Sequence, residues 1–313
     1  QIIFNNVNWA MAKAMVASAA WFAGLPGANF HFKPNAALTN SPAVWRVLEL
    51  PHGAAANHLS LGGAHWLFDV GDETNFRRVL RPYLHSSGIN AVAGVFLSHN
   101  DADHVGAVEK VIAEFDQPRL FCSTQEPGAL DSSLSTLRRL ADATNGGILR
   151  RLRVDERLAL SGDSHFKAEV WVLYPSQQVQ NARGDDRAMV VMLHLGPWRV
   201  LWMSDAGWNA EKTLGSGSDD VRCDVLIRSQ HELDREMSAE FLLKAAPRLI
   251  VCGSDARQAE VQLPDSLVQH AKSQGIPLLD TWSDGSIELR MTADELQALG
   301  ARSEKPVILK PRG

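Results

Sequence analysis

The sequence predicts an α/β fold of the mixed α+β type, with strands and helices that share one core. Short apolar runs alternate along the chain with amphipathic segments, as is typical of strands and helices that share a core. No repeat or low-complexity run interrupts them, and 313 residues are enough to bury a full core. We expect one folded domain at residues 41–313, preceded by a separate segment and linker at residues 1–40.

Ten apolar runs are expected to form strands, and five segments with helical spacing to form helices. The strands are expected at residues 45–50, 58–61, 66–70, 92–97, 167–173, 188–195, 199–203, 225–227, 249–251 and 286–291. The helices are expected at residues 73–85, 107–115, 133–143, 238–246 and 267–274. The dipeptides Gly62-Gly63 and Asp284-Gly285 are typical of hairpin turns.

Residues 9–25 differ from the rest of the chain because Ala, Met, Trp and Phe dominate them. Met11, Met15 and Phe22 recur at nearly helical spacing, which predicts a short amphipathic helix. The stretch is shorter than the ~20 residues of a membrane span and contains Lys13, so we expect a helix that packs on the protein or lies at a membrane surface. It also lacks the basic leader and charge-free core of a secretory signal.

The densest group of metal-binding side chains follows the apolar run 92–97. There, His99, Asp101, Asp103 and His104 occupy six positions of a strand-to-helix turn, where a strand end can present them to a cleft. Two imidazoles and two carboxylates suit zinc, manganese or iron. The alternative interpretation is that Asp101 or Asp103 only caps the helix and that the histidines are surface groups.

Three further apolar runs end in a residue that can bind a metal, namely Asp69, Asp205 and His231. Each of them alone is as well explained by a turn residue, a helix cap or a surface histidine. Four strand ends of this kind along one chain indicate a site that is assembled at one edge of the sandwich.

The sequence Ser-His-Asn-Asp-Ala-Asp-His at residues 98–104 resembles the HxHxDH signature of the metallo-β-lactamase superfamily. With Asp101 in place of the second His, it is similar to the HxDxDH form of the lactamase-like domain of ComEC-type DNA-uptake channel proteins. The other strand-end motifs of that family resemble residues 66–71, 199–205 and 224–231. Ser204 stands where the family usually has Gly, and Gln230 stands where it has the first of two histidines.

The resemblance implies an αββα metallo-β-lactamase-like sandwich that binds one or two divalent ions, zinc or manganese. The implied metal ligands are His99, Asp101, Asp103, His104, Asp205 and His231. Asp103 would also orient the nucleophile, Asp205 would bridge two ions and Asp69 would brace the loop. Arg228, three residues before His231, should point near the metals. Asp103, Asp69 and Arg228 are therefore the expected catalytic residues.

The family usually has one more ligand for the first ion, and the sequence does not place it. His165, Asp185 and Asp186 lie in the expected interval, whereas His194 falls inside a predicted strand. The second ion site, with Asp103, His104, Asp205 and His231, has all its ligands. We therefore expect at least one tightly held metal and a second, looser one.

The function that the resemblance implies is a metal-dependent hydrolase, a phosphodiesterase or nuclease that uses a metal-activated water on DNA during DNA uptake. Single-stranded DNA would be its partner. The start at Gln1 suggests a piece of a longer membrane protein, with the domain membrane-associated on the extracytoplasmic side of a bacterial inner membrane. The alternatives are a catalytically weak module that binds DNA or a protein at the membrane, and a hydrolase of a small ester or lactam.

The charge and cysteine content of the chain bear on these functional predictions. The net charge of −5 argues against a generic nucleic-acid binder, whose affinity depends on neutralised phosphates. Local groups of arginines could still line a path for a phosphate backbone, although solvated faces explain them too. These arginines are Arg77, Arg78, Arg81, Arg138, Arg139, Arg150, Arg151 and Arg153. The three cysteines show no paired spacing and are expected to be small buried hydrophobes.

Overall fold

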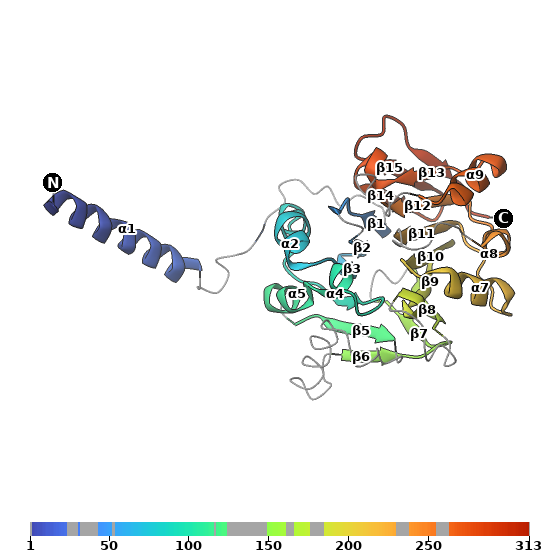
Figure 1. Cartoon of the computed structure of the whole chain (residues 1–313), viewed down its shortest axis with the longest axis horizontal. Coiled ribbons are helices and arrows are strands. Elements are labelled where there is room, and N and C mark those ends of the chain that lie inside the picture. Colours follow the sequence, from blue (N-terminus) through green and yellow to red (C-terminus); the bar gives the residue numbers. More distant parts are fainter. Residues whose placement is uncertain are drawn as a thin grey trace.

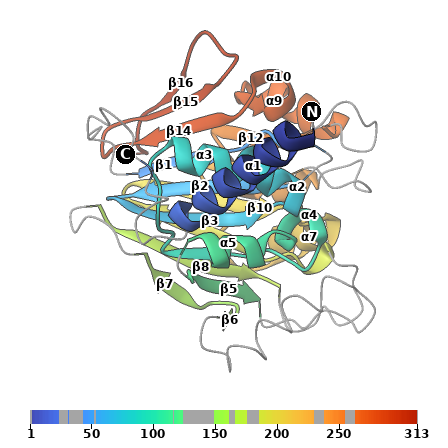
Figure 2. The ribbon, with the colours of Figure 1, turned by 90° about the vertical axis from the view of Figure 1, so that its left-hand side faces the viewer.

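Two β-sheets face one another, and helices cover the outer face of each (Figures 1 and 2). This arrangement is that of a computed structural model, which describes residues 2–23, 31, 43–51, 54–115, 117–123, 149–160, 166–175, 185–229, 238–254 and 263–312. The mixed α/β sandwich that the sequence predicts is therefore confirmed.

In the described part of the chain, the first sheet has nine strands in the order β16-β15-β14-β1-β2-β3-β4-β5-β6. Strands β3 to β6 are parallel, and the other neighbours pair antiparallel. The strands are β1 (Ala43–Val47), β2 (Ala56–Leu61), β3 (Ala64–Val70), β4 (Gly94–Phe96), β5 (Arg119–Ser123), β6 (Leu149–Leu152), β14 (Ile287–Met291), β15 (Leu296–Gly300) and β16 (Val307–Leu309).

The second sheet has seven strands among the described residues, in the order β13-β12-β11-β10-β9-β8-β7. Strands β10 to β13 are parallel, and β7 to β10 pair antiparallel. The strands are β7 (Arg157–Ala159), β8 (Ala168–Tyr174), β9 (Val190–Leu195), β10 (Trp198–Ser204), β11 (Val225–Ser229), β12 (Leu249–Gly253) and β13 (Leu278–Asp280).

Short helices complete the two outer layers. Those next to the first sheet are α2 (Glu73–Asn75), η2 (Phe76–Leu80), α3 (Arg81–Ser86), α4 (Ala102–Val105) and α5 (Val108–Glu114). Those next to the second sheet are α7 (Trp208–Ser216), α8 (Ala239–Ala245) and α9 (Asp265–Gln274). The 3₁₀ turn η3 (Asp185–Arg187) precedes β9, and α10 (Thr281–Asp284) follows β13.

The apolar residues form three layers of core, one between the sheets and one under each helical layer. Strand β10 shows how the sequence builds them, because its side chains alternate between the two faces of the sheet. Trp198 and Trp202 point into the central layer, whereas Leu201 and Met203 pack under the helices. A strand that is buried on both faces must be apolar throughout, so such runs were recognisable in the sequence.

Of the two predicted hairpin turns, one is confirmed and one is wrong. Gly62 and Gly63 form the β2–β3 turn as expected, both with positive φ, as a tight hairpin turn requires. Gly285 instead ends α10 with a φ of +74°, so Asp284-Gly285 terminates a helix rather than joining two strands. The predicted helix at 133–143 lies outside the described residues.

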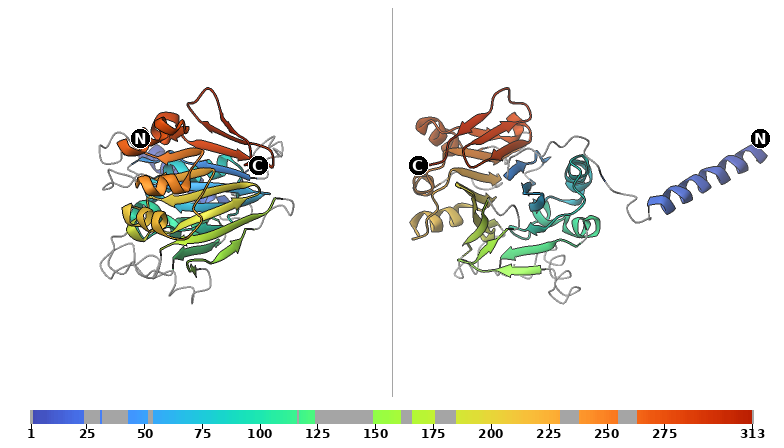
Figure 3. Two further views of the ribbon diagram at one scale, coloured as in Figure 1. Left: turned by 90° about the vertical axis from the view of Figure 1, so that its right-hand side faces the viewer. Right: turned by 180° about the vertical axis from the view of Figure 1, so that it is seen from behind.

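The N-terminal helix α1 (Ile2–Ala23) begins earlier than predicted and extends away from the sandwich in Figures 1 and 3. Trp9, Met15 and Trp21 are 62%, 70% and 64% exposed. Because successive residues of a helix turn by about 100°, these side chains lie on different sides of α1. The predicted amphipathic stripe is therefore wrong, and α1 is apolar around its circumference. Neither α1 nor any other described helix has the combined length and hydropathy for a membrane span.

Candidate metal centre

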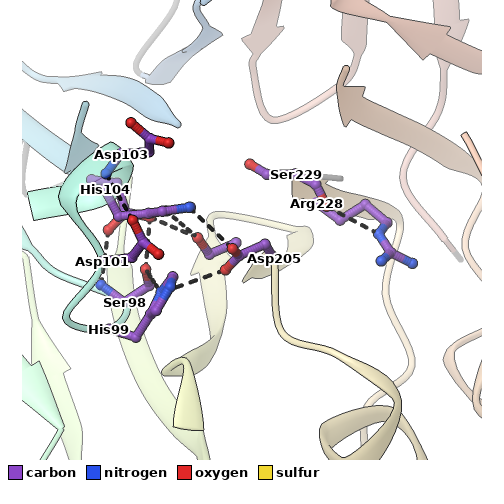
Figure 4. A network of polar contacts seen from close by, with 10 residues as sticks. Ser98, His99, Asp101, Asp103, His104, Asp205, Arg228 and Ser229 are labelled. Atoms are coloured by element: carbon purple, nitrogen blue, oxygen red, sulfur yellow. Dashed lines mark hydrogen bonds and ion pairs between the residues drawn. The ribbon is translucent and has the colours of Figure 1, made fainter. Parts of the chain in front are cut away.

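Polar side chains gather at the ends of β3, β4 and β10, where the two sheets meet at one edge of the sandwich. Asp69 lies near the end of β3. His99 and His104 follow β4, and Asp205 follows β10 (Figure 4). The sequence predicted that these strand ends would meet, and the structure brings these four residues together.

His99, His104 and Asp205 form a metal-binding group. All three are buried, and one ligand atom of each lies within 4.8 Å of the ligand atoms of the other two. Among the described residues, no other group of three or more His, Cys, Asp or Glu side chains meets this criterion. Asp205 Oδ2 is 3.1 Å from His104 Nε2, and Asp205 Oδ1 is 3.5 Å from His99 Nδ1. Ligand atoms about 2.0–2.2 Å from a tetrahedral zinc ion are separated by roughly 3.3 Å, so this donor set fits a divalent ion.

Asp69 holds the loop that carries the histidines. Its buried carboxylate accepts the Ser98 N–H at 2.8 Å on Oδ1 and the Ser98 hydroxyl at 2.8 Å on Oδ2. Oδ2 also lies 2.9 Å from His104 Nδ1. When His104 Nδ1 donates to this carboxylate, Nε2 is left facing Asp205 as a metal ligand. Asp69 has a φ of +56°, a conformation that Asp tolerates better than most residues.

The electrostatics of the group favour a positive charge. Burial disfavours protonation of His104, but the carboxylates of Asp205 and Asp69 outweigh it and raise the pKa of the imidazole well above its ordinary value. Two carboxylates that surround one imidazole would stabilise a divalent cation in the same way. A proton on Nε2 and a metal ion would compete for this nitrogen.

Asp101 and Asp103 lie on the same turn but outside the group of three. Asp101 is the N-cap of α4, and its Oδ1 accepts the Asp103 N–H at 2.9 Å. The Asp103 carboxylate points away from Asp205 in Figure 4. The helix-cap interpretation thus describes Asp101 in this structure, and metal binding by these two carboxylates stays a prediction.

Arg228 lies in a buried ion pair instead of facing the metal-binding group. Its Nη1 is 3.1 Å from Glu211 Oε1 of α7, and both side chains are at most 2% exposed. Glu211 Oε2 also accepts the Ser238 N–H at 2.7 Å. The reason is the alternation of β11: Leu226 packs under the helices, so Arg228, two residues on, points to the same side. The sequence did not identify Glu211, a charged residue buried within a helix.

Of the remaining candidate ligands, His231, His165 and the side chain of Asp185 lie outside the described residues, as does Gln230. Asp186 Oδ2 accepts a hydrogen bond from Asn209 Nδ2 of α7 at 2.8 Å. His194 lies within β9, as predicted.

Comparisons with known proteins identify the fold. Residues 60–156 match the family model described as the metallo-beta-lactamase superfamily. The metallo-beta-lactamase fold protein YhfI from Bacillus subtilis is 12% identical, with a TM-score of 0.51 over 79% of this chain and 99% of that chain. Igni18, a metallo hydrolase from the archaeon Ignicoccus hospitalis, is 12% identical, with a TM-score of 0.53 over 80% and 100%.

The diiron β-hydroxylase CmlA from Streptomyces venezuelae is also similar in structure. It is 14% identical, with a TM-score of 0.52 over 81% of this chain and 55% of that chain. No curated protein matches the chain in sequence. At these identities the structural likenesses show a shared fold, in which more than one chemistry occurs.

Proposed function

We propose that this chain is a metal-dependent hydrolase that cleaves phosphodiesters, with DNA as its substrate. The match of residues 60–156 to the metallo-beta-lactamase superfamily model and the fold shared with YhfI and Igni18 support the hydrolase part of the proposal. The observation that carries the proposal is the buried group of His99, His104 and Asp205 at the edge where the two sheets meet. A bound divalent ion would supply Lewis acidity there, which polarises a phosphoryl oxygen and activates water at neutral pH.

The residues around this group have separable tasks in the proposal. His99 and His104 bind the ion from the first sheet, and Asp205 binds it from the second. Asp69 fixes the ring of His104 through Nδ1. Asp103 would orient the nucleophile from the adjacent turn of α4, as the resemblance to the superfamily implies.

DNA is proposed as the substrate on two grounds. The HxDxDH motif resembles that of ComEC-type domains, and exposed arginines lie on the edge strand β6 and just after it, at Arg150, Arg151 and Arg153. An anionic backbone would bind such a cluster in spite of the net charge of −5. The fold itself does not choose the substrate, since the similar protein CmlA is a hydroxylase.

The proposal is tested by metal analysis together with a cleavage assay. The full chain is purified without chelator, its zinc, manganese and iron contents are measured, and single-stranded DNA is offered with added manganese or zinc. We expect at least one equivalent of metal and metal-dependent cleavage. His104→Asn should abolish both, whereas His194→Asn, in β9 outside the group, should leave both unchanged.

Each other result points to a different function. Bound metal without DNA cleavage would favour a small ester or lactam as the substrate, to be tested with chromogenic substrates of each kind. An absence of both metal and cleavage would contradict the proposal and favour a module that binds DNA or a protein.

We also propose that α1 attaches the protein to a membrane, on the extracytoplasmic side of a bacterial inner membrane. Exposed Trp, Met, Val and Phe side chains around α1 support this attachment, because such a surface is costly to keep in water. The side of the membrane follows only from the resemblance to ComEC-type proteins.

A further inference from the structure

Ser204 is a buried residue in a backbone conformation that favours glycine. It is the last residue of β10, it has a φ of +52°, and no part of it is exposed. The pairing of β10 with β11 shifts register at this point. Glycine adopts this conformation without the clash that a Cβ introduces. A serine here indicates that its hydroxyl makes contacts that offset the backbone strain.

The hydroxyl contacts one ligand of the metal-binding group, His104, and the carboxylate of Asp69 that orients this ligand. Ser204 Oγ donates to Asp69 Oδ2 at 2.7 Å and lies 3.1 Å from His104 Nδ1. When His104 presents Nε2 to an ion, Nδ1 carries the proton and acts as a donor. A hydroxyl has one proton and two lone pairs, so Ser204 can donate to Asp69 and accept part of the His104 hydrogen bond.

These contacts cross from one sheet to the other. Asp69 and His104 belong to the first sheet and its loops, whereas Ser204 ends the strand of the second sheet that leads directly to Asp205. The metal-binding group is thus divided between the sheets, and the Ser204–Asp69 hydrogen bond connects the two parts at the point where they meet.

We propose that the Ser204 hydroxyl is a positioning group for the metal centre. It fixes the ring of His104 and sets the separation between His104 and Asp205 at which both can hold one ion. This inference rests on the metal binding proposed above, and it assigns to Ser204 a role that a glycine at this position could not perform.

The test uses two substitutions that separate the hydroxyl from the backbone strain. Ser204→Ala removes the hydroxyl and keeps a Cβ at positive φ, whereas Ser204→Gly removes both. Affinity of the full chain for Co²⁺ is measured by competition with a chelator, alongside the visible spectrum of the bound ion and the urea midpoint of the metal-free protein. We expect both variants to lose about 10–100-fold in Co²⁺ affinity and to change the spectrum. Only the alanine variant should have a clearly lower urea midpoint.

A matched control is Ser254→Ala. Ser254 is also buried beside a strand end, and its hydroxyl donates to Asp280 Oδ1 at 2.9 Å, outside the metal-binding group. This variant should bind Co²⁺ like the unchanged chain.

Three results would overturn the inference. Unchanged Co²⁺ affinity and spectrum in both Ser204 variants would show that the hydroxyl does not position the ligands, while metal binding itself would stand. Full affinity in the glycine variant alone would assign the effect to backbone strain. If the unchanged chain binds no Co²⁺, Zn²⁺ or Mn²⁺, the proposed function fails and the inference fails with it.

Discussion

The Asp69 carboxylate contacts the side chains of Ser98, His104 and Ser204, so a change at this one residue should reach the whole candidate centre. A carboxylate only accepts hydrogen bonds, whereas an amide must turn either its oxygen or its NH₂ group toward the same donors. Replacing the Asp69 carboxylate by an amide therefore disturbs these hydrogen bonds without changing the size of the side chain.

We expect Asp69→Asn to weaken metal binding by about 10–100-fold, because His104 loses the acceptor that orients it. Chelator competition with Co²⁺ measures the change. The matched control is Asp155→Asn, since Asp155 also has a positive φ, of +66°, but is exposed in a turn outside the metal-binding group. Equal affinities of the two variants would contradict a role for Asp69.

The stability of an Arg228 variant distinguishes a catalytic from a structural role for this residue. Removing one partner of a buried ion pair leaves an uncompensated charge, so Arg228→Met should lower the free energy of unfolding by about 3–5 kcal/mol. Urea denaturation measures this loss. Arg157→Met, which breaks an exposed pair with Glu169, should cost less than about 1 kcal/mol.

If Arg228→Met kept the urea midpoint of the unchanged chain but lost hydrolysis, this result would support the catalytic role that the sequence predicted for Arg228. Restoration of most of the stability by Glu211→Leu in the Arg228→Met background would instead support the structural role, because no unpaired charge then remains buried.

The candidate centre was largely predictable from sequence where strand ends carry conspicuous ligands. His99, His104 and Asp205 meet as expected because the ends of parallel strands meet at one edge. Ser98 and Glu211 were missed because serines and helix glutamates are common, and only the folded chain shows which ones are buried. Counting two residues back places Arg228 on the same face of β11 as Leu226, but Val225, Leu226 and Ile227 are all apolar, so only the folded chain shows that this face lies under the helices.

At the scale of the elements, a row of hydrogen bonds on the outer face of the first sheet joins β1, β2, β3 and α3. Arg46 can only donate, so its Nη1 donates to the Tyr83 hydroxyl at 2.9 Å. The Tyr83 hydroxyl lies 2.7 Å from His58 Nδ1, and His58 Nε2 lies 3.0 Å from His65 Nδ1. With both imidazoles neutral, these contacts are all satisfied when Tyr83 donates to His58 and His58 donates to His65.

Because His58 is buried within these hydrogen bonds, we expect the protein to lose stability in acid. Burial, together with His65 and Arg46, lowers the pKa of His58 well below its ordinary value. The unfolded chain therefore binds a proton near pH 6.5 that folded His58 does not bind, and the free energy of unfolding falls as pH drops below that value. One such group contributes a slope of up to about 1.4 kcal/mol per pH unit.

We expect His58→Gln to lower stability at pH 7.5 by about 1–3 kcal/mol through the altered hydrogen bonds, and to reduce the slope of stability with pH below 6.5. Urea midpoints from pH 7.5 to 5 measure both effects. His270→Gln serves as the control, because His270 is only partly buried on α9, outside this chain of hydrogen bonds. An unchanged slope in His58→Gln would show that another group causes the acid sensitivity.

Strands that are continuous apolar runs were predictable, whereas β5, β6, β7, β13, β15 and β16 were not predicted. Strands with both faces in the core, such as β9 and β10, are continuous apolar runs and were found. The edge strands β6 and β7 were missed because exposed arginines interrupt their apolar residues. A strand at the edge of a sheet has one free side, and charged side chains there hinder pairing with another molecule.

For the whole molecule, a metal ion at the candidate centre would join the two sheets, because His99 and His104 follow a strand of the first sheet and Asp205 follows a strand of the second. An ion that binds only the folded chain should stabilise it by about 2.7 kcal/mol at a free concentration of 100 times its Kd. We expect added Zn²⁺ or Mn²⁺ to raise the Tm, and chelator to reverse the rise. An equal rise in the His104→Asn variant would place the bound ion elsewhere.

The apolar surface of α1 is the feature of the whole molecule that the sandwich leaves unexplained. Trp9, Met15 and Trp21 are 62%, 70% and 64% exposed, and Lys13 is the one charged residue of the helix. A basic residue near an anionic membrane contributes about 1 kcal/mol, so attachment should depend mainly on apolar contact and little on salt.

We therefore expect the full chain to sediment with phosphatidylglycerol vesicles and to stay bound in about 0.5 M salt, roughly three times physiological ionic strength, where charge contacts are screened. Replacing Trp9, Met15 and Trp21 together by Ser should reduce vesicle binding at least tenfold, because apolar surface is the main source of the affinity. The same variant should keep its Co²⁺ affinity, since α1 extends away from the metal-binding group. The opposite result would be that the full chain does not bind vesicles and forms defined oligomers, which the triple substitution dissociates. In that case another copy of α1, and not lipid, covers this surface.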